Sequence, residues 1–235
     1  MRKVFWENPY QTKLTTQVTH VDGSVLLFAD TIIYSFVGGQ ESDKATITKL
    51  STQELATQEI IPILDSKIVD DKIYYTVPEN HELIIGDTIV QTIDWPRRSR
   101  LMRLHFAAEL ILELVSKNYN LPKIGAHISE HKSRIDFATD ENISTYFPAI
   151  LHEYNQIISD DKIIHKDFSD IENQRRYWKI DGFAQVPCGG THVRSTGEVG
   201  FIKLKRERLG KSKERIEITL LDDSVPANNQ PNNNQ

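Results

Sequence analysis

The sequence has little of several things, and each shortage excludes a class of protein. One cysteine among 235 residues makes an internal disulfide impossible, so the chain cannot be a disulfide-stabilised secreted scaffold. No apolar run approaches the roughly 20 residues that span a bilayer. The start, MRKVFWENPY, lacks the apolar stretch of a secretory signal. We therefore expect a cytoplasmic protein whose thiol stays reduced.

Basic residues are also in short supply, because 28 lysines and arginines stand against 33 acidic residues and the net charge is −5. This balance does not indicate a nucleic-acid-binding protein, so any contact with phosphates has to come from local clusters. The sequence contains two clusters, one around Gly210 and one near residue 100. Their members are Lys203, Lys205, Arg206, Arg208, Lys211, Lys213 and Arg215, and Arg97, Arg98, Arg100 and Arg103.

The pattern of apolar residues predicts an α+β chain with two domains and a tail. Residues 1–94 contain short apolar runs separated by turn residues, which predicts a small β-barrel, and Asp22-Gly23 is a strong hairpin signal. Over residues 95–222 helices alternate with strands, which predicts an α+β domain with a mostly antiparallel sheet. The polar tail, residues 223–235, is expected to be disordered.

The run from Arg97 to Lys117 is predicted to be a helix, because it is rich in Leu, Ala, Glu and Arg and contains neither Gly nor Pro. Its middle is apolar on most sides, as in a buried helix. His105 and Glu109 interrupt that surface four residues apart, so their side chains lie on one helical face and could chelate one cation. A solvated stripe that also includes Glu113 is the alternative.

The segment Pro187 to His192 places the only cysteine, Cys188, four residues before His192, with Gly189 and Gly190 between them. Thiolate and imidazole are ligands that Zn²⁺ favours, and the glycines let the backbone curl so that both side chains reach one ion. Together with His105 and Glu109 they make a set of four ligands for one tetrahedral zinc. Without His105 and Glu109, Cys188 and His192 supply only two of the four ligands that a tetrahedral zinc site needs.

His127 and His131 have a similar spacing but do not belong to this set. The sequence around them alternates with the period of a strand, and four residues along a strand span about 13 Å, too far for two side chains to share an ion easily. We therefore leave them out of the predicted metal site.

At these motifs the chain resembles the freestanding alanyl-tRNA editing proteins of the AlaX type, which are similar to the editing domain of alanyl-tRNA synthetase. The resemblance covers nearly the whole chain in order, and the segment from Cys188 to His192 is its most specific part. The matching motifs are Gly38-Gly39-Gln40 with Asp43, Asp94-Trp95-Pro96-Arg97-Arg98, His105 to Glu109, Ile135-Asp136-Phe137, and Cys188-Gly189-Gly190-Thr191-His192.

The resemblance implies a function and a role for each matching residue. The chain would be a trans-editing hydrolase that deacylates seryl-tRNA(Ala), with glycyl-tRNA(Ala) as a second candidate substrate, using one Zn²⁺ per chain held by His105, Glu109, Cys188 and His192. Thr31 would read the serine hydroxyl and Gln40 would act beside the ester. Substrate would be bound by the backbone at Gly38 and Gly39 and by the side chains of Arg97, Arg98, Lys205 and Arg208.

Two departures from the family pattern leave alternatives open. Glu109 stands where the family has a second helix histidine, and Val37 occupies the first position of the usual glycine triplet. A carboxylate binds zinc at a similar length to imidazole, so Glu109 is either a ligand or the mark of a weakened or absent metal site. If it swings free of the ion, it becomes a candidate general base. The alternative functions are a tRNA-binding module with lapsed catalysis and the editing of a related ester such as seryl-tRNA(Thr).

Overall fold

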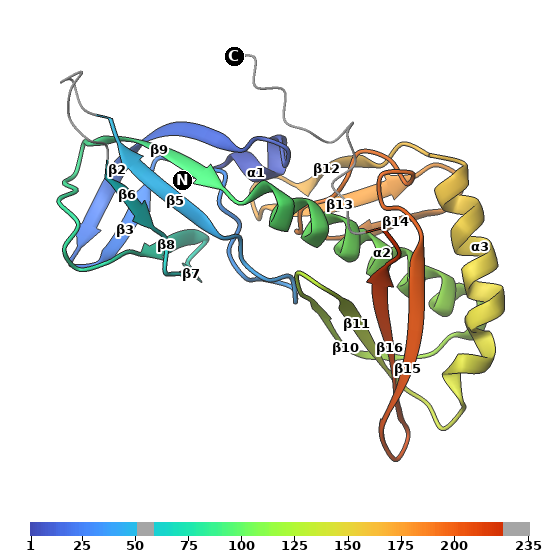
Figure 1. Cartoon of the computed structure of the whole chain (residues 1–235). Coiled ribbons are helices and arrows are strands. Elements are labelled where there is room, and N and C mark those ends of the chain that lie inside the picture. The colour runs from blue at the N-terminus through green and yellow to red at the C-terminus, as the bar shows by residue number, and fades with distance from the viewer. Residues whose placement is uncertain (51–58, 223–235) are drawn as a thin grey trace. The chain divides into compact units, whose positions relative to one another are not determined.

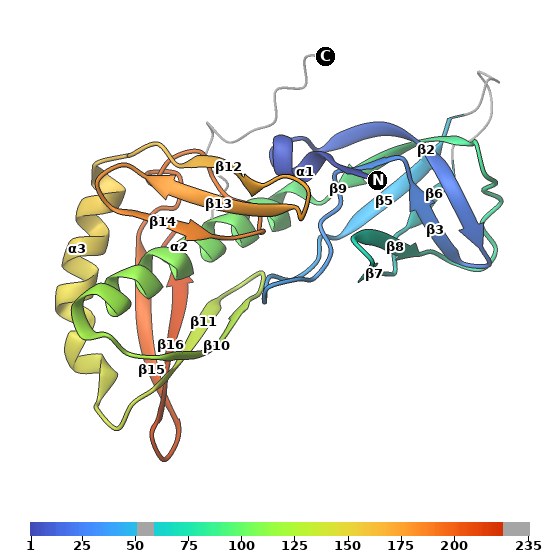
Figure 2. The ribbon, with the colours of Figure 1, turned by 180° about the vertical axis from the view of Figure 1, so that it is seen from behind.

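The computed structural model of the chain describes residues 1–50 and 59–222 (Figures 1 and 2). The tail at 223–235, for which we predict disorder, lies outside the described residues. The chain divides into two compact units: one consists of Met1–Val37 with Ser42–Arg98, and the other of Gly38–Glu41 with the chain from Ser99 onward. The short loop Gly38–Glu41 therefore belongs to the C-terminal unit, although its neighbours in the sequence do not.

The first unit is built almost entirely of strands. β1 pairs with β4 in parallel, and the other strands form one antiparallel sheet in the order β6, β5, β9, β2, β3, β8, β7. The elements are β1 (Arg2–Lys3), α1 (Val4–Glu7), β2 (Lys13–Asp22), β3 (Val25–Phe28), β4 (Asp30–Thr31), β5 (Ala45–Lys49), β6 (Ile60–Pro62), β7 (Asp65–Val69), β8 (Lys72–Thr76) and β9 (Thr88–Ile93). The predicted hairpin is confirmed, since Asp22 pairs with Val25 across a turn in which Gly23 has a φ of 53°.

The ladder of seven strands is open, because β6 and β7 stand at its two edges and do not pair with each other within the described residues. The two edges are nevertheless consecutive in the chain. Only Ile63 and Leu64 separate them, and their N–H groups donate to the carbonyls of Ala45 at 3.0 Å and Thr76 at 2.8 Å. One segment thus runs along both edges of the sheet. An antiparallel β unit is confirmed, whereas no ladder in the described part of the chain closes the predicted barrel.

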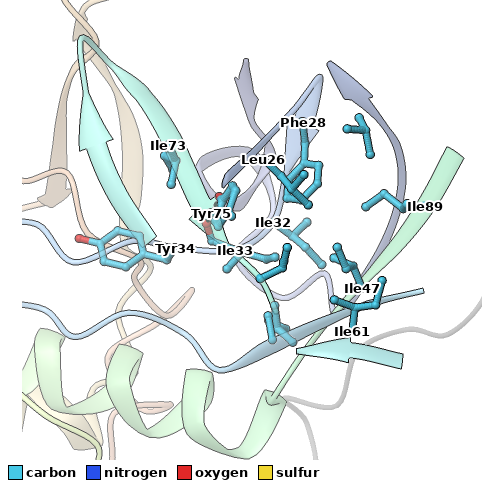
Figure 3. Packing of buried hydrophobic residues seen from close by; sticks show 14 of the residues in the cluster. Leu26, Phe28, Ile32, Ile33, Tyr34, Ile47, Ile61, Ile73, Tyr75 and Ile89 are labelled. Atoms are coloured by element: carbon cyan, nitrogen blue, oxygen red, sulfur yellow. Dashed lines mark hydrogen bonds between the residues drawn. The ribbon is translucent and has the colours of Figure 1, made fainter. Parts of the chain in front are cut away.

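The core of this unit combines alternate residues of its strands with the consecutive residues Ile32, Ile33 and Tyr34, which follow β4 (Figure 3). In β9 every second side chain is buried, as expected for a strand with one face against a core. Ile47 and Ile89 are completely buried, and the rings of Phe28 and Tyr75 stack with centroids 5.1 Å apart. Burying each such side chain stabilises the fold by about 1.5–3 kcal/mol.

The second unit is organised around α2, Trp95–Tyr119, whose first turn belongs to the first unit. This confirms the helix predicted from Arg97 to Lys117. From Leu101 to Ile111 every residue except Glu109 is buried, so the helix has no solvated face along this stretch. A helix that is apolar nearly all round needs cover on more than one side.

Two antiparallel sheets supply that cover, and Figures 1 and 2 show α2 running between them. Their strands are β10 (Lys123–Ile128), β11 (Ser133–Ala138), β16 (Lys213–Leu220) and β15 (Ile202–Gly210) in one sheet, and β12 (His165–Asp170), β13 (Arg175–Ile180) and β14 (Ala184–Pro187) in the other. Leu101 and Leu104 pack on Ile128 of β10, and Phe106 meets Trp178 of β13 with ring centroids 5.1 Å apart. The predicted α+β class with mostly antiparallel sheets is confirmed.

The remaining helical segment flanks this arrangement. It consists of the 3₁₀ helix η1, Ile143–Tyr146, which leads directly into α3, Phe147–Ser159. Ile150, Tyr154 and Ile158 recur at every fourth position and are its buried face. In residues 1–50 and 59–222 no helix combines the length and the apolar character needed to cross a membrane.

Candidate metal centre

Three side chains from two distant parts of the sequence converge in the second unit. The Cys188 Sγ lies 3.5 Å from His105 Nε2 and 3.3 Å from His192 Nε2. One donor atom from each residue lies within 4.8 Å of the others. Both imidazoles are buried and the thiol is half-buried. The two half-sites that the sequence predicts are therefore brought together into one candidate metal-binding group.

The loop that carries Cys188 and His192 is held by backbone contacts. Cys188 directly follows β14, and its N–H donates to the carbonyl of Arg176 at 2.9 Å. Lys166 of β12 donates to the carbonyls of His192 at 3.4 Å and Val193 at 3.2 Å. The His192 ring also lies edge-on to the ring of Phe106 of α2, with centroids 5.5 Å apart. Both the backbone and the ring of His192 are therefore fixed.

Gly190 allows this loop to approach α2. A Cβ placed on Gly190 would overlap the Cε1 and Nδ1 atoms of the His105 ring and would come within 2.9 Å of Gln40 Oε1. The neighbouring Gly189 has nothing within 4 Å of such a Cβ. Only the second glycine of the pair is thus required by close packing on the histidine.

Glu109 lies one helical turn from His105 and faces the same group. Its Oε1 is 3.4 Å from His105 Nε2 and 3.7 Å from Cys188 Sγ, while its Oε2 accepts a hydrogen bond from Trp178 Nε1 at 3.0 Å. The tighter group of mutually close donors comprises only the two histidines and the cysteine. A direct role for Glu109 as a ligand therefore stays a proposal.

Gln40 contacts the histidine from the side opposite the donors. It is completely buried, its Oε1 lies 2.7 Å from His105 Nδ1, and its Nε2 donates to Thr191 Oγ1 at 2.9 Å. Since the amide oxygen can only accept, we place a proton on Nδ1, so Nε2 is the nitrogen that would bind a metal ion once it has lost its own proton. This contact fixes the tautomer that a metal ligand needs. The predicted role of Gln40 beside the ester stays a prediction.

We expect Gln40→Leu to weaken metal binding by about 10–100-fold, because the hydrogen bond that orients His105 is lost. Gln40→Glu should keep most of the wild-type affinity for the metal, since a carboxylate also accepts a hydrogen bond from His105 Nδ1. Chelator competition on the purified variants measures both effects. Gln91→Leu is the matched control: Gln91 is equally buried but bonds Ile32 N and Asp30 O in the first unit. A loss of affinity in the control as large as in Gln40→Leu would contradict the assignment.

The electrostatics of the group favour a bound cation. Burial alone would lower the pKa of His105, but the adjacent negative charges of Cys188 and Glu109 raise it to about 10. Burial lowers the pKa of His192 well below its usual value, with His105, Arg176 and Lys166 adding to the effect. Burial would raise the pKa of Glu109, but His105 and the Trp178 hydrogen bond lower it. The lowered pKa of His192 favours its neutral ring, which is the form that ligates a metal ion, and the lowered pKa of Glu109 favours its carboxylate.

Two of the predicted substrate-binding residues, Arg97 and Arg98, make internal contacts in the structure. Arg98 is completely buried, and its guanidinium pairs with Asp43 and donates to the carbonyls of Pro9 and Ile32. Arg97 is 8% exposed and donates to the carbonyl of Ser42. A buried guanidinium that is already satisfied is not available to a phosphate. In the structure both arginines stabilise the first unit, and a role for them in binding substrate stays a prediction.

Thr31 and Gly39 also have structural roles within the chain, while the roles that we predict for Thr31, Gly38 and Gly39 toward substrate stay predictions. The Thr31 hydroxyl is completely buried, lies 2.7 Å from Tyr75 Oη and accepts from the N–H of Ile33, so it is already used within its own unit. Gly39 has a φ of 89°, and a Cβ there would meet the carbonyl oxygen of Ala126 at 2.8 Å. Its lack of a side chain thus serves close packing on β10. Around Gly38, with a φ of 62°, a Cβ would meet nothing within 4 Å.

The basic cluster around Gly210 lies on the β15–β16 hairpin, where part of its charge is neutralised. Lys205 lies 3.5 Å from Glu217, and Arg208 is exposed opposite Glu214. Arg206 pairs with Glu214, and Arg215 pairs with Asp136 and Glu207. The hairpin is therefore less basic than its sequence indicates.

His127 lies on β10, as the alternation of that segment predicts, and its Nε2 is 3.4 Å from Glu41 Oε1. His131 follows the end of that strand. Neither belongs to the group of converging donors, which consists of His105, Cys188 and His192.

Sequence reasoning missed the residues that support the donors. Trp178 and Lys166 lie on separate strands, far in sequence from the side chains that they contact. The one available signal for Trp178 was its place in the alternating run from Arg175 to Ile180, which predicts that it points toward the core. The identity of its polar partner depends on the tertiary fold.

Comparisons with known proteins agree with the motifs. A family model described as the threonyl and alanyl tRNA synthetase second additional domain matches residues 179–217, which include Cys188 and His192. The alanyl-tRNA editing protein AlaX-M of Pyrococcus horikoshii is 30% identical over 93% of this chain and 97% of its own length.

Two further relatives extend the comparison. AlaX-M of Saccharolobus solfataricus is 25% identical over 93% of this chain and 98% of its own length. The alanine–tRNA ligase of Methanococcus aeolicus is 28% identical over 92% of this chain, but the match spans only 25% of the ligase. Because the 30% identity to the first relative extends over nearly all of both chains, the present chain belongs to the family of AlaX-M-type alanyl-tRNA editing proteins.

Proposed function

We propose that this chain is a trans-editing hydrolase that removes serine from mischarged seryl-tRNA(Ala), with glycyl-tRNA(Ala) as a second candidate substrate. The observation that carries the proposal is the convergence of His105, Cys188 and His192 on one point in a chain of the editing family. Two imidazoles and a thiolate are a donor set typical of zinc enzymes, where a further position is taken by substrate, water or another ligand.

The residues present fit one Zn²⁺. The Nε2 atoms of both histidines and the Sγ of Cys188 face one another, and the Gln40 contact favours the tautomer of His105 that can ligate. We propose Glu109 Oε1 as the fourth ligand, which would make the site formally neutral when the thiolate and carboxylate are counted against the ion. Zinc bound there supplies Lewis-acid chemistry that can act on the ester or orient it.

The chain's own side chains then hold the geometry. Gln40 orients His105 and anchors Thr191 of the metal loop, and Lys166 holds the carbonyls on the C-terminal side of the same loop. Donors fixed in this way need little reorganisation when the ester is bound, which is how preorganised sites lower a barrier. Glu109 would serve as a general base only if its Oε1 did not bind the ion, because its Oε2 accepts from Trp178.

Discrimination between serine and alanine requires a polar site. The two amino acids differ by one hydroxyl, and a site that hydrogen-bonds that hydroxyl leaves its own polar groups unpaired when alanine is bound. This penalty can give a discrimination of roughly 10⁴ or more. The cognate alanyl ester would therefore survive while the seryl ester is cut.

Lys205 and Arg208 of the β15–β16 hairpin remain our candidates for contact with tRNA phosphates. Both side chains are exposed, although each faces a glutamate across the hairpin. A chain with an overall charge of −5 needs such local positive groups to approach RNA. Binding through them would weaken as salt rises, because phosphate contacts release counterions.

Single-turnover hydrolysis of seryl-tRNA(Ala), alanyl-tRNA(Ala) and seryl-tRNA(Thr) tests the proposal. We expect rapid loss of serine from the alanine tRNA alone. Preferential cutting of seryl-tRNA(Thr) would replace the proposed substrate by the related ester. Salt-dependent tRNA binding without hydrolysis of any ester would instead indicate a binding module whose catalysis has lapsed.

A further inference from the structure

Glu109 is held by an indole that the family motifs do not include. Trp178 of β13 is completely buried, and its Nε1 donates to Glu109 Oε2 at 3.0 Å. The Glu109 side chain is only 16% exposed. A carboxylate so far withdrawn from water needs a donor, because an unpaired buried charge is costly.

The hydrogen bond gives the two oxygens of the Glu109 carboxylate different environments. Oε2 faces the indole, whereas Oε1 faces His105 Nε2 at 3.4 Å and Cys188 Sγ at 3.7 Å. The indole itself cannot turn easily, since its ring packs edge-on against Phe106 with centroids 5.1 Å apart at 66°. One oxygen is thus fixed and the other is aimed at the metal donors.

We propose that Trp178 is a positioning residue that holds Glu109 as a ligand binding the metal through Oε1 alone. This inference rests on the proposed function, because it assigns a role around the same metal centre. Its physical reason lies in the flexible side chain of glutamate, which has more rotatable bonds than that of histidine. Without a partner, the carboxylate would turn away from the negative charge of Cys188. A hydrogen bond to a metal ligand from a residue that does not itself bind the metal typically raises the metal affinity by a factor of about 10–100.

Trp178→Phe tests the role, because phenylalanine keeps an aromatic ring against Phe106 but lacks the N–H group. We expect zinc affinity, measured by chelator competition, to fall about tenfold. Trp95→Phe is the matched control, since Trp95 Nε1 is buried without a hydrogen-bond partner among the described residues. The control should bind zinc within about twofold of the wild type. An unchanged affinity in Trp178→Phe would overturn the proposal.

A double-mutant cycle shows whether the indole acts through the carboxylate. We expect Glu109→Ala to weaken zinc binding, and Trp178→Phe to have no further effect in that background, because the two residues form one unit. Additive losses would mean that Trp178 acts through packing alone and would contradict the proposal. A wild-type protein that binds no zinc would overturn the proposed metal centre itself. Normal zinc binding by the wild type with additive losses in the variants would overturn only the role of Trp178.

The contact can also be measured without changing Trp178. In proton–nitrogen NMR spectra of the metal-free protein, the three tryptophans give three indole N–H signals. Glu109→Ala should move one of them, assigned to Trp178, and should speed its exchange with solvent. If all three signals keep their positions and exchange rates, the hydrogen bond is absent in solution and the proposal is wrong.

Discussion

Cys188→Ala is expected to reduce hydrolysis of seryl-tRNA(Ala) by roughly 10³-fold, a loss of about 4 kcal/mol of transition-state stabilisation, and to abolish stable zinc binding. Cys188 Sγ lies close to the Nε2 atoms of both histidines, at 3.5 Å from His105 and 3.3 Å from His192. Without the thiolate the close donor group loses one of its three members, so only two imidazoles and the more distant Glu109 carboxylate are left to hold the ion. Single-turnover assays with zinc measured per chain test both expectations.

The position is suited to such a test because Cys188 is only half-buried, so its loss leaves no large core cavity. The thermal midpoint of the metal-free variant should stay close to that of the metal-free wild type. Ser195→Ala is the matched control, since Ser195 is half-buried in the same loop and lies outside the donor group. A Cys188→Ala protein that still cuts the seryl ester at the wild-type rate would exclude the thiolate from the chemistry.

Gly190→Ala should disrupt the metal centre by displacing His105, and we expect the zinc affinity and the rate of seryl-tRNA(Ala) hydrolysis each to fall by about 100-fold. The added methyl group would overlap the ring of His105 and approach Gln40 Oε1, so the histidine has to leave its position or the loop has to move outward. Either change spoils the convergence of the donors. Overpacking of this kind also costs about 1–3 kcal/mol of folding stability. Chelator competition and thermal unfolding measure the two effects separately.

The adjacent glycine offers the control for this prediction. Gly189→Ala meets nothing within 4 Å, and neither glycine has a positive φ, so the backbone accepts alanine at both positions. We expect Gly189→Ala to keep its zinc affinity within about twofold. Equal losses in the two variants would mean that loop flexibility, rather than the space beside His105, is what the glycines provide.

The metal donors could be predicted because their chemistry is visible in residue types and spacing. His105 and Glu109 interrupt an otherwise apolar helix, and Cys188 and His192 flank a glycine pair. The helix itself was predictable because it lacks Gly and Pro over a long apolar stretch. What spacing could not supply is the distance between the two half-sites, which depends on how β13 and β14 bring the loop to α2.

The roles of Arg98, Gln40 and Trp178 were not predictable for a related reason. A run of arginines resembles a solvated or phosphate-binding surface, yet Arg98 turns inward to Asp43, which lies 55 residues earlier. The hydrogen bonds of Gln40 to His105 and of Trp178 to Glu109 join residues 65 and 69 positions apart. Burial and long-range hydrogen bonds are properties of the folded chain. A sequence motif can therefore indicate which residues belong to a site, but it does not indicate what each of them contacts.

The most direct test of the account is to titrate zinc into the metal-free protein while the single-turnover rate of seryl-tRNA(Ala) hydrolysis is recorded. The account predicts that the rate rises in proportion to bound zinc and reaches a plateau at one ion per chain. Full hydrolysis by the metal-free protein, or no hydrolysis at full occupancy of the site, would contradict it.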